Sequence, residues 1–432
     1  MNHEPYSSRR QTLLASIGDG VVLIPTAAEC IRNRDSRYPY RFDSYFWYLT
    51  GFAEPEAALV LIGGDAPRSI LFCREKNAER EIWEGFRHGP DAAREVFGFD
   101  EAYAFGELER RLPELIAGRP ALWYALGHDA AWDTRVTAAL NAVRAQASAS
   151  ARAPEQLRDP RAPLDRMRRV KDASELALMR RAADIASAGH LRAMRVCSPG
   201  LAEYQLEAEL THEFRARGAD GHAFLPIVAG GGNACVLHYV GNNQQLADHA
   251  LVLIDAGCEL NGYAADISRT FPVNGRFSGA QREVYEIVLA AHTAAVAAIR
   301  PGAPFDAYHA AAVRVLARGM IDLGLLSGDL DGLIASEAYK PFYMHRTGHW
   351  LGLDVHDAGD YRSDDDWVAL VPGMTLTVEP GLYLRPGADV PERLRGIGVR
   401  IEDDVIVTAD GAEVYTSAPR TIAGIEEVMR RA

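Results

Sequence analysis

The feature that most constrains the fold is an Asn-Gly pair, Asn261–Gly262, set between two apolar runs that are typical of strands. Asn-Gly suits a two-residue turn whose central residues both need positive φ, so the pattern predicts a tight antiparallel hairpin. Counting outward from this turn pairs Asp255 with Ser268. The alternation of side chains then places Asp255 and Asp266 on the same face, about 7 Å apart at their Cα atoms.

These two aspartates are the first candidates for chemistry. Either one alone would more often end a strand or cap a turn than bind a ligand. Together they lie on one face, and Asp255 directly follows the apolar run Leu251–Ile254, which is typical of a buried strand. Buried carboxylates need a compensating charge, so the pair indicates a site that could hold one or two cations.

Three histidines, His345, His349 and His356, fall within twelve residues, although the whole chain of 432 residues contains only 13. The spacing of the first two resembles a helical zinc pair. However, the glutamate of an H-E-x-x-H motif is missing, and Gly348 and Gly352 disfavour a helix. We therefore expect a non-helical segment that presents one metal ligand and leaves the other histidines for proton transfer or substrate contact.

Two later segments add further carboxylates. Glu379 precedes Pro380, which favours an extended backbone and the end of a strand. Arg400 and Glu402 share one face of a predicted strand, either as a surface ion pair or with the arginine orienting a metal-bound carboxylate. His238 is a weaker candidate, for which placement in the core or on the surface is as consistent with the pattern as a functional role.

The length exceeds what one hydrophobic core usually supports, so we expect two domains. A proline-rich stretch at 147–165 predicts a linker between an α/β domain at 1–165 and an α+β domain at 166–432. The second domain should open with a helix capped by Asp172 and Glu175. Further helices are expected at about 202–218, 279–299 and 304–324, and strands at about 21–24, 57–62, 69–73, 121–124, 224–229, 251–257, 263–272, 374–379 and 398–407.

Composition excludes several other classes of protein. The formal net charge of −13 would repel a phosphate backbone, so no nucleic-acid partner is expected. The five cysteines are scattered and form no C-x-x-C pair, which argues against a disulfide framework and against a thiolate zinc site. There is no apolar run long enough for a signal peptide or a membrane span, so we expect a cytoplasmic protein without a membrane partner.

Taken together, these segments resemble the Xaa-Pro aminopeptidase (aminopeptidase P) family of pita-bread-fold metallopeptidases. The resemblance rests on IDAGCELNGYAADISRTFPV, GHWLGLDVHD, TVEPGLY and GIGVRIEDD, which occur in the family's order. Two N-terminal segments, RDSRYPYR and FWYLTGF, are similar to the family's first domain. The resemblance covers nearly the whole chain. It implies an α+β fold, with a C-terminal pita-bread catalytic domain of two similar halves preceded by a smaller α/β domain.

The resemblance also implies roles for individual residues. The metal ligands would be Asp255, Asp266, His349, Glu379 and Glu402. The other residues at the reacting centre would be His238, His356 and Arg400, with His345 and Tyr383 contacting substrate. Asp35 and Trp83 of the first domain would help to close the site of their own or of a neighbouring subunit. Residues Asp364–Asp366 depart from the family pattern, since a basic residue is expected near them at the rim of the site.

The implied cofactors are two Mn²⁺ ions, and Co²⁺, Fe²⁺ or Zn²⁺ remain alternatives. Four carboxylates would repel one another without two divalent cations, and oxygen ligands with one imidazole suit Mn²⁺. The implied activity is removal of the residue before a proline at peptide N-termini, by a homo-oligomer such as a dimer or tetramer. Among the four carboxylates we expect Glu379 to shuttle the proton, because glutamate reaches further than aspartate.

Three alternatives remain at this point. A prolidase, which cleaves only Xaa-Pro dipeptides, would share the five ligands. A pita-bread domain can also serve as a non-catalytic binding module, and a creatinase-like enzyme works without metal. The presence of all five ligands disfavours the last two.

Overall fold

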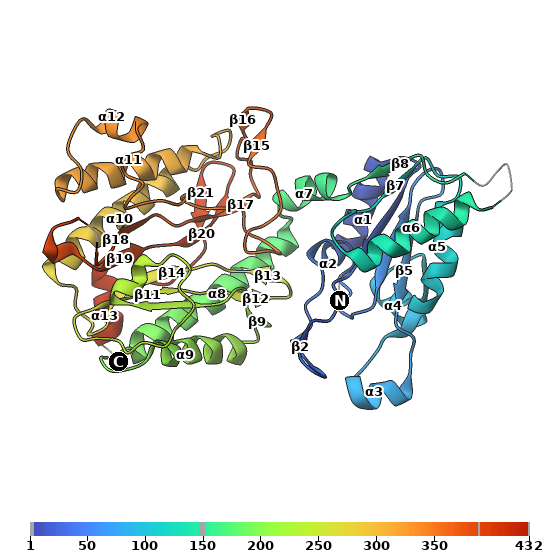
Figure 1. The fold of residues 1–432 in the computed structure, drawn as a ribbon, viewed down its shortest axis with the longest axis horizontal. Coiled ribbons are helices and arrows are strands. Elements are labelled where there is room, and N and C mark those ends of the chain that lie inside the picture. The colour runs from blue at the N-terminus through green and yellow to red at the C-terminus, as the bar shows by residue number, and fades with distance from the viewer. Residues whose placement is uncertain (1–3, 147–151, 388, 431–432) are drawn as a thin grey trace. The chain divides into compact units, whose positions relative to one another are not determined.

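The computed structural model describes residues 4–146, 152–387 and 389–430. The chain forms two compact units, the first ending at Met167 and the second starting at Arg168, and each is described by itself (Figure 1). No helix in the described ranges is both long and apolar enough to cross a membrane.

The N-terminal unit is built on a six-stranded mixed sheet with the order β6-β5-β4-β1-β7-β8. Its strands are β1 (Val21–Pro25), β4 (Ala58–Ile62), β5 (Arg68–Cys73), β6 (Glu101–Ala104), β7 (Ala121–Trp123) and β8 (Gln156–Arg158). Its helices are α1 (Glu4–Ile17), α2 (Ser44–Thr50), α3 (Ala78–Glu84), α4 (Gly89–Phe97), α5 (Leu108–Ile116) and α6 (Ala130–Arg144). Apolar side chains of β1, β4 and β5 pack against α5 and α6, so strands and helices share one core, as the sequence predicted.

The proline-rich stretch at 147–165 is only partly the expected linker. Residues 147–151 lie outside the described residues. Beyond them, β8 pairs with the parallel strand β7 at the edge of the sheet, and α7 (Arg161–Arg169) follows. Pro154 and Pro160 flank β8 without interrupting it, so the amides within the strand remain available for pairing. A local count of prolines cannot distinguish this arrangement from an open linker.

The C-terminal unit combines small antiparallel sheets with long helices. One sheet has the order β10-β11-β14 and another the order β17-β20-β21. The strands are β9 (Gly221–His222), β10 (Ile227–Gly230), β11 (Leu251–Asp255), β12 (Cys258–Leu260), β13 (Tyr263–Ala264), β14 (Ser268–Pro272), β15 (Arg362–Ser363), β16 (Asp366–Trp367), β17 (Thr375–Val378), β18 (Gly381–Leu384), β19 (Ile397–Arg400), β20 (Asp403–Val407) and β21 (Ala412–Val414). This antiparallel arrangement confirms the α+β class expected for this part of the chain.

The helices of this unit are α8 (Ala173–Val196), α9 (Glu203–Ala216), α10 (Gly279–Ala298), α11 (Ala307–Asp322), α12 (Leu330–Ala335) and α13 (Ile422–Arg430). Helix α8 begins at the predicted capping box, in which Asp172 and Glu175 each accept a hydrogen bond from the other residue's backbone amide. Helices α8 and α9 pack together, as do α10 and α11 (Figure 1). Helix α8 contacts β12 and β13, whereas α10 contacts β17, β18, β19 and β21.

The predicted hairpin has the predicted register. Leu260 pairs with Tyr263 and Asp255 pairs with Ser268. Asn261 and Gly262 have φ values of 50° and 82°, the positive values that this two-residue turn requires. The expected single strand at 263–272 divides into β13 and β14, because the amide of Asp266 donates to the Asp404 carboxylate instead of joining the ladder.

The strand expected at 398–407 is also divided in two. Strand β19 pairs with β18, and after a break at 401–402 strand β20 pairs with β17. At the break, the amide of Glu402 donates to the carbonyl of Ser268 in β14, at 3.0 Å. The chain thus passes from the β18–β19 sheet to the β17–β20–β21 sheet, and Glu402 lies at this crossing point.

Candidate metal centre

The candidate residues of the C-terminal unit surround a cavity of about 1080 Å³. Its lining contains both predicted aspartates, both predicted glutamates, the four predicted histidines and the predicted arginine. These are Asp255, Asp266, Glu379, Glu402, His238, His345, His349, His356 and Arg400. They come from five separate stretches of sequence, at 238, 255–266, 345–356, 379 and 400–402, that the fold brings to one cavity.

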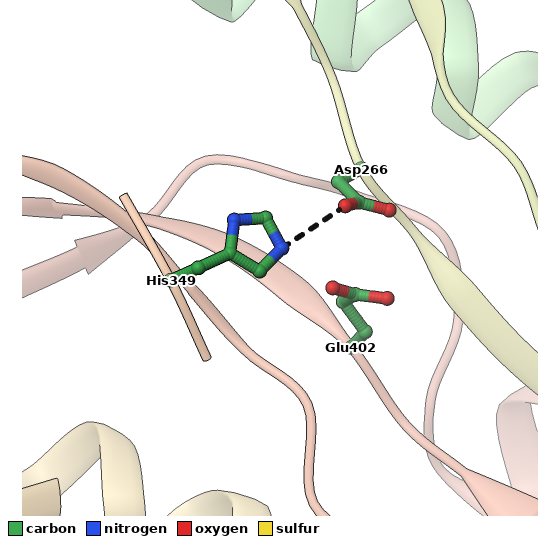
Figure 2. A group of neighbouring side chains, drawn as sticks. All are labelled: Asp266, His349 and Glu402. Carbon is green, nitrogen blue, oxygen red and sulfur yellow. Dashed lines mark ion pairs between the residues drawn. The ribbon is translucent and has the colours of Figure 1, made fainter. Parts of the chain in front are cut away.

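Asp266, His349 and Glu402 form the tightest group, each offering one ligand atom with all three atoms within 4.8 Å of one another. Figure 2 shows the imidazole of His349 pointing toward both carboxylates. Its Nε2 lies 3.5 Å from Oδ2 of Asp266 and 3.7 Å from Oε1 of Glu379. Glu379, which directly follows β17, therefore belongs to the same cluster.

The backbone around His349 fixes which ring nitrogen faces the carboxylates. Its Nδ1 lies 2.8 Å from the carbonyl of Trp350, to which it must donate, so Nε2 keeps a free lone pair. The amide of His349 donates to the Thr377 hydroxyl at 3.1 Å. A Cβ atom on Gly348 would come within 1.9 Å of the Thr377 carbonyl, so this approach needs glycine. The segment contains no helix between residues 345 and 357, as predicted.

Arg400 is buried, which excludes the surface ion pair that the sequence left open. Its Nη2 donates to Oδ2 of Asp255 at 2.6 Å, and its Nε donates to the Ser268 hydroxyl at 2.8 Å. That hydroxyl donates in turn to Oε2 of Glu402, at 2.7 Å. The guanidinium thus orients Asp255 directly and Glu402 through Ser268.

Tyr383 is fully buried behind the cavity wall and is not one of the lining residues. Its hydroxyl accepts from Nη1 of Arg400 at 3.2 Å and lies 2.8 Å from Nε2 of His345. His345 Nδ1 donates to the carbonyl of Arg346, so Nε2 accepts from the tyrosine. Burial lowers the pKa of His345 to about 3, helped by Arg400, and raises the pKa of Tyr383 to about 12. Both groups are therefore neutral near pH 7.

The carboxylate cluster lacks sufficient positive charge from the protein. Burial raises the pKa of Asp266 and of Glu402 well above the usual value, and neighbouring carboxylates raise both further. Burial also raises the pKa of Glu379, against the influence of His349 and Arg400. Within the described residues, no donor reaches the buried Oδ1 atoms of Asp255 and Asp266. Oxygen atoms of this kind, with one imidazole nitrogen, fit a divalent cation.

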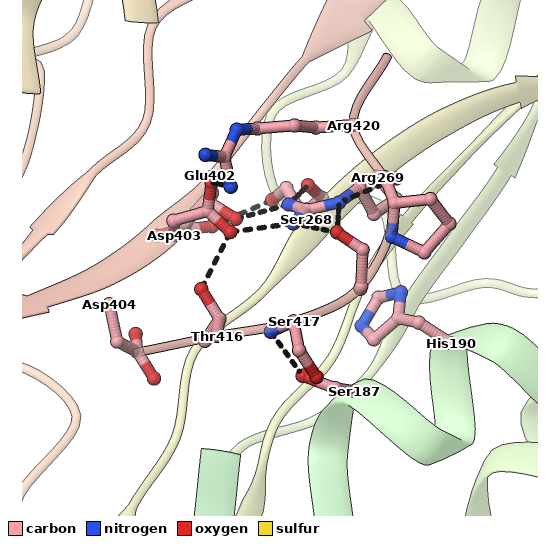
Figure 3. A network of polar contacts seen from close by, with 12 residues as sticks. Ser187, His190, Ser268, Arg269, Glu402, Asp403, Asp404, Thr416, Ser417 and Arg420 are labelled. Carbon is pink, nitrogen blue, oxygen red and sulfur yellow. Dashed lines mark hydrogen bonds and ion pairs between the residues drawn. The ribbon is translucent and has the colours of Figure 1, made fainter. Parts of the chain in front are cut away.

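A second buried network of hydrogen bonds holds the backbone of Glu402 (Figure 3). The guanidinium of Arg269 donates to the carbonyls of Ser268 and Glu402 and to the carboxylate of Asp403. Asp403 also accepts from the Thr416 hydroxyl at 2.6 Å. These contacts join β14 to the start of β20 and hold the Glu402 backbone in place.

Of the four remaining predicted residues, two line the cavity and two belong to the N-terminal unit. His238 and His356 line the cavity and are exposed, with the His356 ring 4.2 Å from that of His349. Burial lowers the pKa of His356, and His349 lowers it further. Asp35 and Trp83 belong to the N-terminal unit, where both are exposed. Their predicted role in closing a site stays a prediction.

Several residues of the site were not predicted. Ser268 was paired correctly with Asp255 by register but given no role. Thr377 could also have been found from the alternation of side chains, since it lies two residues before Glu379 on the same strand face. Arg346 and Trp367 also line the cavity, with the guanidinium 4.6 Å from the centre of the indole ring. Nothing in the local sequence pattern indicates this last contact.

Comparison with known proteins identifies a family for both parts of the chain. The model of metallopeptidase family M24 matches residues 177–409, and that of the aminopeptidase P N-terminal domain matches residues 6–123. The chain is 46% identical to a Xaa-Pro aminopeptidase of Escherichia coli, over 97% of this chain and 95% of that protein. It is 34% identical to human Xaa-Pro aminopeptidase 3, over 99% of this chain and 86% of that protein.

Solved structures show the same likeness in three dimensions. An aminopeptidase PepP from Pseudomonas aeruginosa has a TM-score of 0.98 and 49% identity, covering 100% of this chain and 98% of that one. A zinc-substituted E. coli aminopeptidase P in complex with product has a TM-score of 0.97 and 45% identity, covering 100% and 99%. These matches confirm the expected fold, an aminopeptidase P N-terminal domain followed by a pita-bread domain.

Proposed function

The chain belongs to metallopeptidase family M24 and carries the N-terminal domain of aminopeptidase P, and from this membership we propose that it removes the residue before a proline at peptide N-termini. The observation that carries the proposal is the convergence of four carboxylates and the free Nε2 of His349 on one cavity wall. The likeness to Xaa-Pro aminopeptidases over nearly the full chain supports the choice of substrate.

We propose that two divalent cations, Mn²⁺ in the native enzyme, are held by five residues. These are Asp255, Asp266, His349, Glu379 and Glu402. When bound, such ions lower the pKa of a coordinated water and polarise the scissile carbonyl. The support for two ions is the charge of the cluster. Four carboxylates converge there, and burial raises the pKa values of Asp266, Glu379 and Glu402, so the cluster needs more positive charge than Arg400 supplies.

The chain's own groups supply the proton transfers. Glu379 would accept a proton from the attacking water and deliver it to the proline nitrogen as the peptide bond breaks. Its backbone amide donates to the carbonyl of Thr347 at 2.8 Å. This bond holds the backbone that carries the Glu379 carboxylate close to the segment that carries His349. His238 and His356, which are exposed and line the cavity, would donate hydrogen bonds to the developing oxyanion.

We further propose that the N-terminal unit mediates homo-oligomer formation and site closure. Three large apolar side chains on and just after α3, Ile82, Trp83 and Phe86, are between 67% and 81% exposed. Exposed apolar groups of this size are typical of interfaces. Asp35, on the turn between β2 (Ile31–Asn33) and β3 (Ser36–Arg37), would act from the same unit. The proposed compartment is the cytoplasm, in keeping with five free cysteines.

The test compares three substrates in buffer with defined Mn²⁺: an Xaa-Pro-Yaa tripeptide, an Xaa-Pro dipeptide and an Xaa-Ala-Yaa tripeptide. We expect release of the first residue from the Xaa-Pro-Yaa peptide and little from the alanine analogue. Hydrolysis of the dipeptide alone would identify a prolidase. Failure to cleave any of the three, with metal bound, would reject the proposal in favour of a binding module.

A further inference from the structure

The segment that carries His238 has little regular structure of its own. It runs from 236 to 243, between the 3₁₀ turn η2 (Gly231–Cys235) and an isolated bridge at Gln245, and contains neither helix nor strand. The position of His238 in the cavity wall therefore depends on side-chain contacts from elsewhere. Two glutamates of α9 provide them, and α9 itself packs against β10.

Glu203, the first residue of α9, has no exposed surface and accepts four hydrogen bonds. Its Oε1 accepts from the amide of Gly230 at 2.8 Å and from Nδ2 of Asn233 at 3.0 Å. Its Oε2 accepts from the hydroxyl of Tyr239 at 2.8 Å and from the amide of Gln244 at 3.0 Å. One carboxylate thus joins the end of β10, the η2 turn, the residue that follows His238 and Gln244, which directly follows the segment.

Glu207, one helical turn further along α9, holds the same segment at a second point. Its Oε2 accepts from Nδ2 of Asn242 at 2.9 Å. Asn242 is buried and in turn donates to the carbonyl of Pro226, while its Oδ1 accepts from the amide of Val228 at 3.0 Å. The segment is therefore attached on the C-terminal side of His238 to α9 and to β10 together.

We propose that Glu203 is a positioning residue, which acts through Tyr239 to hold His238 in the cavity wall. Tyr239 directly follows His238, so the bond from its hydroxyl to Glu203 restrains the backbone that carries the imidazole. The inference rests on the proposed function, in which His238 contacts the developing oxyanion. It assigns a role to a side chain that does not line the cavity.

The chemistry of the carboxylate makes the role testable. All four partners of Glu203 donate, so both of its oxygens must accept. In Glu203→Gln one end of the side chain becomes an amide NH₂ group, which cannot accept from the two donors that face it. Tyr239→Phe is milder, because it removes only one hydroxyl and keeps the ring.

The kinetic test is a double-mutant cycle on the metal-loaded full chain with an Xaa-Pro-Yaa tripeptide. We expect kcat to fall about 5-fold in Tyr239→Phe and at least about 10-fold in Glu203→Gln, with unchanged metal content. On a His238→Ala background neither change should lower kcat further, because residues acting through one group are not additive. Equal losses of kcat in the wild-type and His238→Ala backgrounds would overturn the proposal, and so would no loss in the wild-type background.

Two matched controls lie on the same helix. Tyr204→Phe removes a hydroxyl from a side chain that is 57% exposed, and Glu209→Gln removes a carboxylate that pairs with Arg192 instead of the segment. Both should keep the kcat of the wild type. A loss in Tyr204→Phe as large as that in Tyr239→Phe would count against a specific role for the bond to Glu203.

Hydrogen exchange measured by mass spectrometry gives a readout that does not depend on activity. Amides of the segment 236–244 should exchange faster in Glu203→Gln than in the wild type, while those of the α10–α11 pair stay unchanged. Unchanged exchange in the segment would overturn the proposal even if the enzyme is active. Inactivity of the wild type toward all peptides would reject the proposed function instead, and the exchange result would still decide whether Glu203 holds the segment.

Discussion

Asp357 lies at the centre of a buried ion network next to His356. Its Oδ1 accepts from Nη2 of Arg168 at 2.6 Å and its Oδ2 from Nζ of Lys171 at 2.9 Å, and all three side chains are 1% exposed. Arg168 also reaches Asp354, at 2.7 Å. The network ties the segment that follows His349 to the residues immediately before α8. Replacing Asp357 by Asn keeps the size of the side chain and removes its charge.

The expected cost follows from the charges left behind. In Asp357→Asn the buried side chains of Arg168 and Lys171 both lose the charged carboxylate, while Arg168 still reaches Asp354, whose side chain is 42% exposed. Removing one partner of a buried ion pair typically costs about 3–5 kcal/mol, because the other charge stays buried without compensation. For a domain of this size, 1 kcal/mol corresponds to about 2–4 °C in Tm. We therefore expect the Tm of the C-terminal unit to fall by about 6–20 °C.

The effect should depend on pH in a defined direction. Burial alone would raise the pKa of Asp357, but Lys171 and Arg168 outweigh it and bring the pKa below its usual value. A carboxylate with a lowered pKa stabilises the fold above its unfolded pKa of about 3.9, and this stabilisation is lost as pH falls through the lower folded pKa. The difference between wild type and Asp357→Asn should therefore be constant above about pH 5 and shrink below pH 4.

The assay is calorimetric unfolding of both proteins, without added metal, between pH 3 and pH 8. Asp354→Asn is the matched control, because the same arginine loses a partner that is partly exposed. That change should cost less than about 1 kcal/mol. If Asp357→Asn costs no more than its control, or if the difference does not change with pH, the buried pairs do not stabilise this segment as argued.

Other expectations concern the metal centre and the hairpin. Exhaustive chelation should abolish peptidase activity and Mn²⁺ should restore it, whereas full activity with no metal in elemental analysis would contradict the proposed centre. Glu379→Gln should lower kcat at least ~100-fold; a variant with full metal occupancy and near-normal kcat would exclude Glu379 as the proton shuttle. Because the pKa values of Asp266 and Glu402 are raised, metal binding should release protons and weaken as pH falls, which calorimetry in buffers of different ionisation enthalpy can measure. Gly257→Ala should destabilise the hairpin, since the new Cβ would lie 1.6 Å from the carbonyl of Ala265, and a Tm within 1 °C of wild type would refute this.

The sequence predicted most where local chemistry determines the structure. The pairing of Asp255 with Ser268 followed from one turn dipeptide and the alternation of side chains, and the structure has that register. The capping box at Asp172 is likewise specified by two side chains only three residues apart. In both cases the interacting groups lie close together in the chain, so a pattern of residue types is sufficient.

The predictions failed where distant segments compete for the same backbone. Nothing near Asp266 shows that its amide will donate to Asp404, so the break between β13 and β14 could not be seen. Glu203 reads as an ordinary first-turn helix residue, yet its partners extend from Gly230 to Gln244. Buried polar networks of this kind depend on tertiary packing, which one sequence does not reveal.

The break at Glu402 has a consequence for the order in which the protein is made. Asp255 and Asp266 leave the ribosome on the β11–β14 hairpin, while Glu402 follows only after α10, α11 and β17 have been synthesised. At ~5–20 residues per second, about 7–27 seconds pass between the synthesis of Asp266 and that of Glu402. In the proposed centre, cation binding by all five ligands therefore cannot precede the synthesis of Glu402. A nascent chain stalled before Glu402 would carry the neighbouring carboxylates of Asp255 and Asp266 without the last of the proposed ligands.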